Sequence, residues 1–196
     1  MSEDMRARKA ALRRACLERR RHLDPTVVRT ASAAIGERLR GLPACAAAAA
    51  VHTYVDAVPN EVATRGFIAW CLAAGKRVVV PVVVGRRPPM GHAEIRALEE
   101  LEAGPKGLLQ PPPERARWWP EDVPLDLVVV PGVAFDRRGC RLGHGGGFYD
   151  AFLARRPAPV AVGLVYDELL LDEVPVEAHD LPVDLVLTPS AAWPCP

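Results

Sequence analysis

The stretch PGVAFDRRGCRLGHGGGFYD, residues 131–150, decides both the fold and the function expected of this chain. Five glycines fall within nine residues of it, at positions 139, 143, 145, 146 and 147. Because glycine has no Cβ, such a run can adopt positive φ and turn successive amide N–H groups toward one point, as phosphate binding requires. The apolar run LDLVVV, residues 125–130, predicts a buried strand before the loop, and a helix is expected over residues 147–155. A strand, a glycine loop and a helix N-terminus together predict an anion site.

The spacing of the glycines excludes two familiar phosphate loops. No Lys-Ser or Lys-Thr follows them, so the loop is not a P-loop, and the GxGGG core does not have the spacing of a dinucleotide fingerprint. A glycine cluster by itself is equally typical of a flexible surface turn. The flanking residues therefore decide between the two readings.

With its flanks, the stretch resembles the signature of the 5-formyltetrahydrofolate cyclo-ligase family, which runs roughly PGxAFDxxGxRLGRGGGYYDxxL. The matching positions are Pro131, Gly132, Ala134, Phe135, Asp136, Gly139, Arg141, Leu142, Gly143, Gly145, Gly147, Tyr149, Asp150 and Leu153. The chain departs from the pattern at His144, where the family usually has Arg, at Phe148, usually Tyr, and at Leu169, usually Gln. The resemblance covers Lys9 to Thr188 and is thinner over residues 85–124.

Composition limits the other classes of function. The 196 residues are enough for a single domain over residues 1–196, and 49% hydrophobic with 25% charged residues is ordinary for a globular protein. The net charge of +1 gives no global field for nucleic acid. Five widely spaced cysteines without a CxxC pair disfavour disulfides and zinc, and no leader or membrane segment is evident. We therefore expect a cytoplasmic monomer with no membrane or nucleic-acid partner.

The chain alternates strand and helix patterns. Helices are expected over residues 5–22, 25–40 and 61–74, the third capped by Asn60, and strands over residues 46–55, 76–84, 125–130, 160–165 and 184–188. Pro81 suggests a strand end or sheet edge near that point. Residues 85–124 are irregular, with room for a small antiparallel hairpin, and a helical turn is expected over residues 168–172.

This order predicts an α/β fold, a three-layer αβα open sandwich around a mainly parallel sheet. The resemblance implies the fold shared with ribose-phosphate isomerase and CoA-transferase type proteins. In such sheets, ligands bind at the carboxyl ends of the strands.

The resemblance assigns ATP binding to the glycine loop and to the first helix. Lys9 and Arg13 are four residues apart and share a helix face, so they can neutralise a polyphosphate together. The alternative for both is a solvated face, and we interpret Arg19 to Arg21 in that way. The residues implied to contact ATP are Lys9, Arg13, Arg141, Gly143, His144, Gly145, Gly146, Gly147, Phe148, Tyr149 and Asp150, with catalytic roles for Lys9, Arg141, His144 and Tyr149.

Asp150 is the expected magnesium ligand, because Mg²⁺ takes one or two carboxylates together with ATP phosphates and water. The alternative is an acid at a helix start. Asp136 is expected to form a turn, since an Asp followed by Gly is common turn chemistry. His144 is largely neutral at pH 7, unlike Arg, so it is expected to weaken ATP binding or to mark altered chemistry.

The substrate-binding residues implied by the resemblance are Tyr54, Glu61, Gln110 and Tyr149. Glu61 would contact the folate, the alternative being an ordinary first-turn Glu, and the alternative for Gln110-Pro111 is only a rigid loop. His22, His52 and His92 show no ligand spacing and are interpreted as incidental. His179-Asp180 is interpreted as mainly structural, at the end of the sheet.

The resemblance therefore implies an ATP- and Mg²⁺-dependent enzyme that converts 5-formyltetrahydrofolate to 5,10-methenyltetrahydrofolate, with release of ADP and phosphate. His144 and Leu169 leave open a relative that activates an amide or formamide of another small molecule at the same ATP site. A non-catalytic nucleotide- or RNA-binding protein using the Arg-rich first helix is a third possibility, against which the near-zero net charge argues.

Overall fold

The structure is a computed structural model that describes residues 3–85, 87–155 and 159–195. Within these residues the centre is an eight-stranded mixed sheet of order β13-β12-β10-β7-β1-β2-β3-β6. Its inner strands are all parallel: β12 (Leu185–Leu187), β10 (Val160–Leu164), β7 (Leu127–Val130), β1 (Ala50–Thr53) and β2 (Arg77–Val82). Antiparallel strands complete both edges: β13 (Ala192–Pro194) on one side, and β3 (Gly91–Ile95) and β6 (Arg117–Trp118) on the other.

The strands with continuous apolar sequence lie deepest. Every residue of β7 is 0% exposed, as are Val78, Val79 and Val80 of β2. Such runs suit strands that are covered on both faces, where no position can be polar.

Pro81 does not mark a sheet edge, because β2 has a neighbour on each side. The pairing of β2 with β1 ends at Val79, and the strand itself ends at Val82. The missing N–H of Pro81 therefore lies beyond the reach of β1, where it costs no ladder hydrogen bond.

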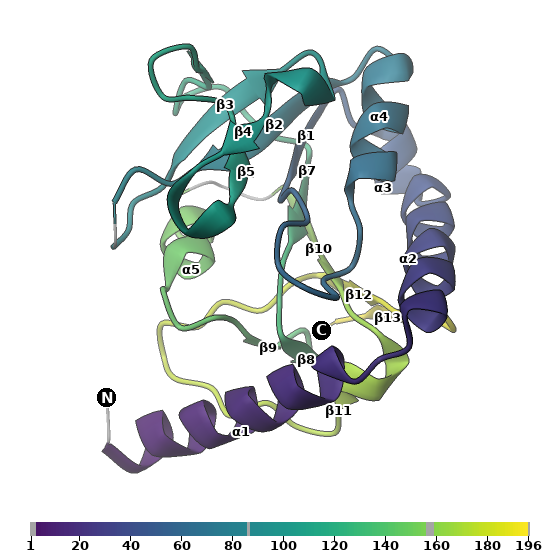
Figure 1. The fold of residues 1–196 in the computed structure, drawn as a ribbon, viewed down its shortest axis with the longest axis vertical. Helices are drawn as coiled ribbons and strands as arrows, with labels where there is room; N and C mark the ends of the chain where they lie inside the picture. The colour runs from purple at the N-terminus through teal and green to yellow at the C-terminus, as the bar shows by residue number, and fades with distance from the viewer. Residues whose placement is uncertain (1–2, 86, 156–158, 196) are drawn as a thin grey trace.

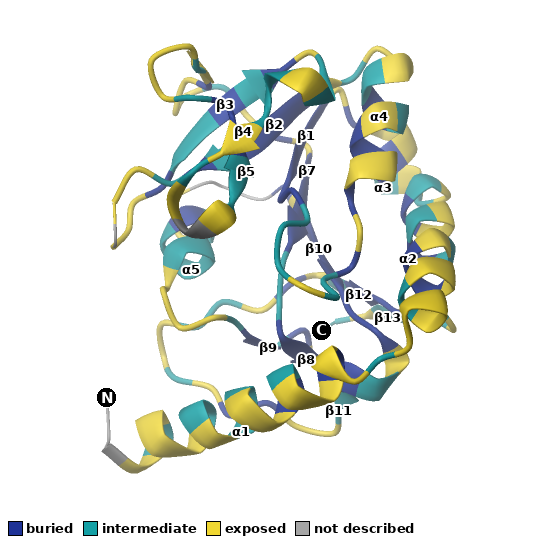
Figure 2. Ribbon diagram, viewed as in Figure 1, coloured by how far each residue is buried: buried dark blue, intermediate teal, exposed yellow. Residues whose placement is uncertain are grey.

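Helices cover both faces of the sheet, as the sequence predicts. Helices α2 (Pro25–Arg40), α3 (Pro43–Ala47) and α4 (Arg65–Ala73) lie on one face, and α5 (Phe148–Leu153) lies on the other (Figure 1). The ring of Phe152 on α5 stacks on His92 with ring centroids 4.0 Å apart. Buried residues concentrate in the strands and on the inner sides of these helices (Figure 2).

The first helix, α1 (Glu3–Arg21), crosses the end of the molecule at which β7 and β10 finish (Figure 1). A small sheet of β8 (Ala134–Asp136), β9 (Arg141–Leu142) and β11 (Leu170–Leu171) lies at the same end, with the 3-10 turn η3 (Asp167–Leu169) before β11. Asn60 Nδ2 donates to the Arg20 carbonyl at 3.0 Å, which ties the segment after β1 to α1.

The third predicted helix begins later than expected. Asn60 has a φ of 55° and does not cap a helix, and α4 begins at Arg65. The Asp56 carboxylate accepts the N–H groups of Thr64 and Arg65 at 2.8 and 3.0 Å. The start of α4 is therefore set by an acid eight residues upstream, which leaves Glu61 in a loop instead of a first helical turn.

Three further elements differ from the expectation. Pro43 starts the short helix α3, so the strand predicted from residue 46 begins at Ala50. Strands β3 and β6, from the region that was expected to be irregular, join the main sheet. The same region contains the expected hairpin, formed by β4 (Glu102–Ala103) and β5 (Leu109–Gln110), and the 3-10 turns η1 (Leu98–Glu100) and η2 (Pro105–Gly107). None of the helices within the described ranges is long and apolar enough to cross a membrane.

Candidate active site

The order of the parallel strands locates the site. Across the sheet the parallel strands lie in the order β2-β1-β7-β10-β12. The chain adds β2 on one side of β1, and then adds β7, β10 and β12 on the other side, so the strand order reverses between β1 and β7. Ligands of open α/β sheets bind at such a switch point, in the crevice outside the carboxyl ends of the strands. The segment after β1 carries Tyr54 and Glu61, and the segment after β7 leads into the glycine loop. These two segments therefore meet where a ligand is expected.

The glycine loop, residues 143–147, offers unused backbone donors. Gly145 and Gly147 have φ of 91° and 67°, a conformation that side chains rarely adopt. No amide N–H of the loop donates a hydrogen bond to another described residue, and His144 to Gly147 are exposed. Successive free N–H groups around positive-φ glycines form an anion-binding nest. The helix that follows has only six residues and ends at Leu153, so the loop carries the anion site and the helix dipole adds little.

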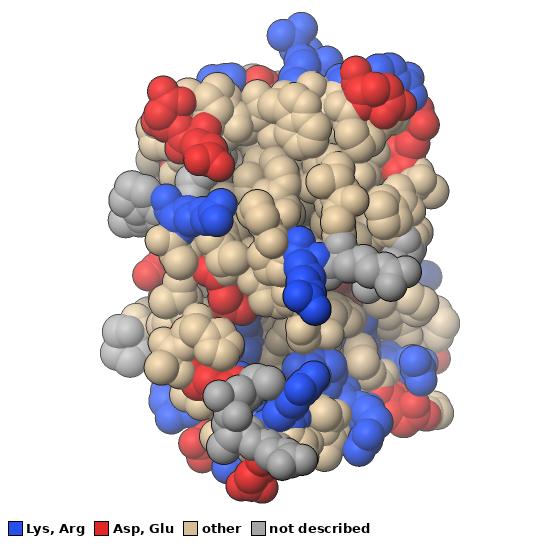
Figure 3. Space-filling view, turned by 90° about the vertical axis from the view of Figure 1, so that its left-hand side faces the viewer, with Lys and Arg blue, Asp and Glu red and all other residues tan. Residues whose placement is uncertain are grey.

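Two cations of α1 lie beside the loop. Arg13 Nε donates to the Gly143 carbonyl at 2.6 Å, and Lys9 Nζ contacts Glu177 Oε2 at 3.0 Å and Asp180. Burial lowers the pKa of Lys9, but the hydrogen bonds and charges of Asp180 and Glu177 outweigh it and raise the pKa overall. Figure 3 shows basic side chains in the lower part of the face that carries α5, at the α1 end of the molecule. The loop donors and these cations together suit a polyphosphate.

Asp150 is held in place at the end of the loop. Arg141 is buried, and its guanidinium donates to Asp150 Oδ1 and to the Leu181 carbonyl. The Leu181 N–H also donates to Asp150 Oδ1, at 3.3 Å. Arg141 thus positions Asp150. Asp180, which contacts Lys9, is the residue immediately before Leu181, so a second carboxylate lies nearby.

No group of three His, Cys, Asp or Glu side chains that could hold a metal occurs within the described ranges. A cation at Asp150 would therefore need oxygens from phosphate and water as well. Mg²⁺ is bound in this way, through one or two carboxylates, so these residues fit magnesium better than a metal that needs a complete protein cage.

Tyr149 and Glu61 form the other side of the site. The Tyr149 hydroxyl is buried and no described residue accepts or donates a hydrogen bond to it. Burial, and then the charge of Glu61, raise the pKa of Tyr149, so the hydroxyl stays protonated and can donate. Burial also raises the pKa of Glu61, while the charge of Arg20 opposes this rise. A buried donor without a described partner beside a half-buried carboxylate is suited to a polar ligand.

His144 stands on the loop surface with its ring partly shielded from water. This desolvation, and then the charges of Arg20 and Arg13, lower the pKa of His144 below its usual value. At pH 7 the imidazole is therefore neutral and offers one N–H donor, where an Arg would offer a full positive charge.

Comparison with known proteins agrees with this geometry. Residues 5–189 match the profile of the 5-formyltetrahydrofolate cyclo-ligase family. The 5-formyltetrahydrofolate cyclo-ligase of Mycolicibacterium smegmatis is 35% identical over 188 residues, which cover 92% of this chain and 93% of that protein. The chain belongs to the 5-formyltetrahydrofolate cyclo-ligase family.

Two further relatives of this enzyme family extend the comparison. The Escherichia coli 5-formyltetrahydrofolate cyclo-ligase is 31% identical over 183 residues, covering 90% of this chain and 97% of that protein. The NMR structure of the Aquifex aeolicus 5,10-methenyltetrahydrofolate synthetase superposes with a TM-score of 0.81 at 29% identity, covering 95% of this chain and 92% of that one. The mainly parallel α/β fold predicted from the alternation of strands and helices, and implied by the cyclo-ligase resemblance, is confirmed.

The cyclo-ligase signature also has a packing role. A Cβ on Gly132 or Gly163 would lie 2.3 Å from the ring of Phe135, so the ring fits only between two glycines. Asp136 forms the predicted turn, because its carboxylate accepts the N–H groups of Arg138 and Cys140 at 2.9 and 3.1 Å.

Two residues that the family resemblance assigns to substrate binding have their polar groups occupied by the protein. The Tyr54 hydroxyl donates to the Val62 carbonyl at 2.9 Å. The Gln110 amide accepts from the Val83 N–H at 2.9 Å and donates to the Val83 carbonyl at 3.3 Å. Each side chain stabilises the segment that follows β1 or β2, and a substrate contact by either would involve other atoms. Phe148 lies against Gly146, where a Cβ would come within 2.8 Å of its ring.

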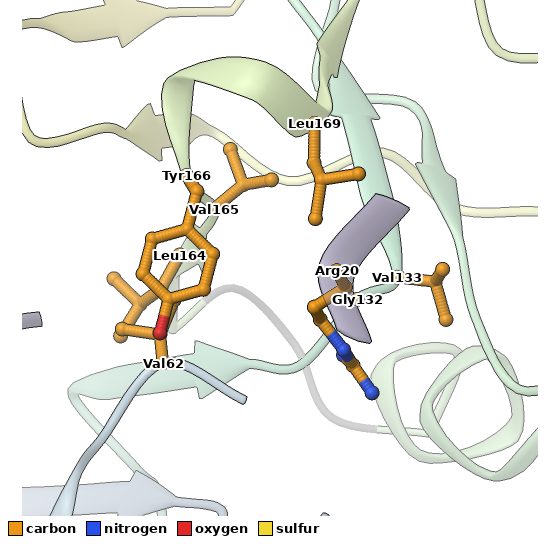
Figure 4. A pocket seen from close by; sticks show the side chains of 8 residues that line it. All are labelled: Arg20, Val62, Gly132, Val133, Leu164, Val165, Tyr166 and Leu169. Carbon is orange, nitrogen blue, oxygen red and sulfur yellow. The ribbon is translucent and has the colours of Figure 1, made fainter. Parts of the chain in front are cut away.

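Sequence reasoning missed two residues of the site. Asp180 was interpreted as mainly structural, and its pairing with Lys9 beside the loop was not predicted. Arg20 was interpreted as solvated surface, yet it is 3% exposed and lines a small hollow that also contains Leu169 (Figure 4). The charge pattern on α1 could have indicated Arg20, since it lies eleven residues after Lys9, close to three full turns. His52 Nε2 and His92 Nδ1 lie 3.1 Å apart, so these two histidines, read as incidental, form a pair.

Proposed function

We propose that this chain catalyses the ATP- and Mg²⁺-dependent conversion of 5-formyltetrahydrofolate to 5,10-methenyltetrahydrofolate, releasing ADP and phosphate. One observation carries the proposal. The free amides of residues 143–147 lie beside Lys9 and Arg13 and lead directly into Tyr149, whose buried hydroxyl has no partner among the described residues. A phosphate-binding loop and a polar substrate site are thus continuous, as transfer of phosphate to a bound substrate requires.

The reaction needs positioning and charge neutralisation more than covalent help. The formyl oxygen of the substrate attacks the γ-phosphorus, and the O–P bond forms as the bond to the β-phosphate oxygen breaks and ADP leaves. The N10 amine then attacks the activated formyl carbon, the carbon–oxygen bond breaks, phosphate leaves, and N10 loses its proton. Charge develops on phosphate oxygens in both steps, where the loop N–H groups, Lys9 and Arg13 can stabilise it.

Asp150 is the residue we assign to magnesium, with Asp180 as the neighbouring carboxylate. When bound, Mg²⁺ would neutralise phosphate charge and orient the leaving oxygen. Arg141 keeps the Asp150 carboxylate in place through its hydrogen bond. Lys9 does the same for Asp180.

Glu61 and Tyr149 are the groups we assign to the folate. Glu61 offers a half-buried acceptor, suited to an N–H of the substrate, and Tyr149 offers a buried donor. Their burial excludes water from the reacting groups, which strengthens each hydrogen bond. His144 completes the loop with one neutral donor.

Another amide or formamide substrate is the second candidate, and the apolar Leu169 in the hollow is the observation that favours it. RNA binding by α1 is disfavoured, because the net charge is only +1 and Lys9, Arg13 and Arg20 contact the protein. We also infer a cytoplasmic location, from five free cysteines, and a monomer.

The test is absorbance in the methenyltetrahydrofolate band after mixing the protein with 5-formyltetrahydrofolate and MgATP. We expect ATP-dependent growth of the band and a loss of about 100-fold in kcat for Asp150→Asn. Asp122→Asn, at an exposed position, should behave as wild type. Absence of turnover in the wild type, with MgATP still raising its melting temperature, would contradict the folate substrate and support a different amide.

A further inference from the structure

Arg20 is the residue that the proposed mechanism leaves unused. It lies near the end of α1 between two exposed arginines, Arg19 and Arg21, yet only 3% of it is exposed. Its side chain lines the hollow at the carboxyl ends of β7 and β10, and Figure 4 shows it beside Gly132 and Leu169. Its backbone carbonyl accepts from Asn60 Nδ2, which holds this turn of α1 against the segment after β1.

The guanidinium of Arg20 has no acceptor within residues 3–85, 87–155 and 159–195. Among the described residues none forms an ion pair with it or accepts a hydrogen bond from its side chain. Its charge nevertheless acts on Glu61 and Tyr166, whose pKa values burial raises and Arg20 lowers. A guanidinium carries five donors, and in this nearly buried side chain water or a ligand is left to satisfy them. Such a group is retained where a ligand supplies the acceptor.

The walls of the hollow indicate what kind of ligand this is. Besides Arg20 it is lined by Gly132, Val165 and the apolar or aromatic side chains of Val62, Val133, Leu164, Tyr166 and Leu169. The Tyr166 hydroxyl is already bonded to Ser32 at 3.0 Å and to the Glu61 carbonyl at 3.1 Å. Arg20 is therefore the charged donor among the residues that line this hollow. The hollow is small, so it suits the carbonyl-bearing edge of a flat ring whose remainder lies outside it, whereas a phosphate would be stripped of water among valines and leucines.

The position of Arg20 along α1 separates it from the phosphate site. It lies seven residues beyond Arg13, about 10 Å along the helix axis. Arg13 and Lys9 already lie at the loop. Resting on the proposed function, we propose that Arg20 donates to the ring carbonyl of the pteridine in the reduced folate and thereby sets substrate affinity without contributing to ATP binding.

The test compares Arg20→Met with Arg21→Met, whose parent side chain is 70% exposed and pairs only with Glu18 in the described part of the chain. We expect Arg20→Met to raise the KM for 5-formyltetrahydrofolate about tenfold or more and to leave the KM for ATP within about twofold. Arg21→Met should match the wild type in both constants. The same KM penalty is expected with 5-formyltetrahydropteroate, which lacks the glutamate tail, and Arg20→Lys should restore part of the affinity.

A melting experiment distinguishes substrate binding from a structural role. Because the Arg20 side chain is nearly buried and has no ion-pair partner among the described residues, Arg20→Met should melt at the same temperature as wild type or higher, while the upward shift produced by 5-formyltetrahydrofolate shrinks. A lower melting temperature with unchanged KM values, a rise in the KM for ATP instead, or a penalty that vanishes with the pteroate substrate would each overturn the proposal. Failure of the wild type to turn over or bind the folate would overturn the proposed function and this inference together, whereas an active wild type with an unaffected Arg20→Met overturns only the inference.

Discussion

Tyr149→Phe should make the ligand-free protein more stable and the enzyme less active. The Tyr149 hydroxyl is buried and has no hydrogen-bond partner among the described residues. An unsatisfied buried hydroxyl costs about 1–3 kcal/mol, of which we take the lower end. For a chain of this length, about 1 kcal/mol corresponds to a rise of about 2–4 °C in melting temperature. If the hydroxyl donates to the substrate, kcat/KM falls about tenfold, equivalent to about 1.4 kcal/mol.

Tyr54→Phe is the matched control for the sign of the stability change. Tyr54 is also buried, but its hydroxyl donates to the Val62 carbonyl at 2.9 Å. Removing it leaves that carbonyl unsatisfied, so the melting temperature should fall by about 2–4 °C. Thermal melts by circular dichroism and the methenyl absorbance assay measure both effects. A Tyr149→Phe protein that melts below the wild type, or that keeps full kcat/KM, would refute the assignment of this hydroxyl to the ligand.

Two further predictions concern stability. Burial raises the pKa of Asp180, but hydrogen bonds from Lys9 and from the Glu177 N–H outweigh burial and lower the pKa overall. The stability that Asp180 contributes is therefore present above its usual pKa of 3.8 and is lost as the pH falls through the pKa of the folded protein. The melting-temperature difference between wild type and Asp180→Asn should therefore be largest near neutral pH and shrink below about pH 4, while the exposed Asp172→Asn shows no such trend; a constant difference for Asp180→Asn would contradict the pairing. Gly163→Ala should lower the free energy of unfolding, measured in denaturant melts, by about 1–3 kcal/mol, because its Cβ would lie 2.3 Å from the Phe135 ring. Gly36→Ala is the control: a Cβ there would meet no atom within 4 Å, so the substitution should be neutral or stabilising. Equal effects of the two alanines would show that the Phe135 contact is not tight.

The strongest local patterns predicted the core of the fold. The β-branched runs predicted as strands over residues 76–84 and 125–130 contain β2 and β7. Continuous apolar sequence is typical of a strand that is buried on both faces. The glycine loop was likewise predictable, because positive φ at Gly145 and Gly147 is a property of the residues themselves. These features depend on neighbours in sequence and need no tertiary information.

The features that were missed depend on distant partners. The start of α4 is set by Asp56, and β13 exists because β12 offers an edge to residues 192–194. Arg20 and its exposed neighbours look alike in sequence, since burial of one and not the others follows from how α1 lies on the sheet end. Asp180 faces Lys9 across 171 residues of chain. No local pattern contains these pairings.

The strand order explains why these distant groups form one site. After β1 the chain turns to α4 on one face, and after β7 it turns through the glycine loop to α5 on the other (Figure 1). The two connections diverge, so the carboxyl ends of β1 and β7 are left uncovered by their own helices. Helix α1 covers that opening and places Lys9 and Arg13 at the loop and Arg20 at the hollow. The proposed phosphate and ring sites thus lie at different points along a single helix, which is why a substitution at Arg20 should change folate affinity while ATP affinity is retained.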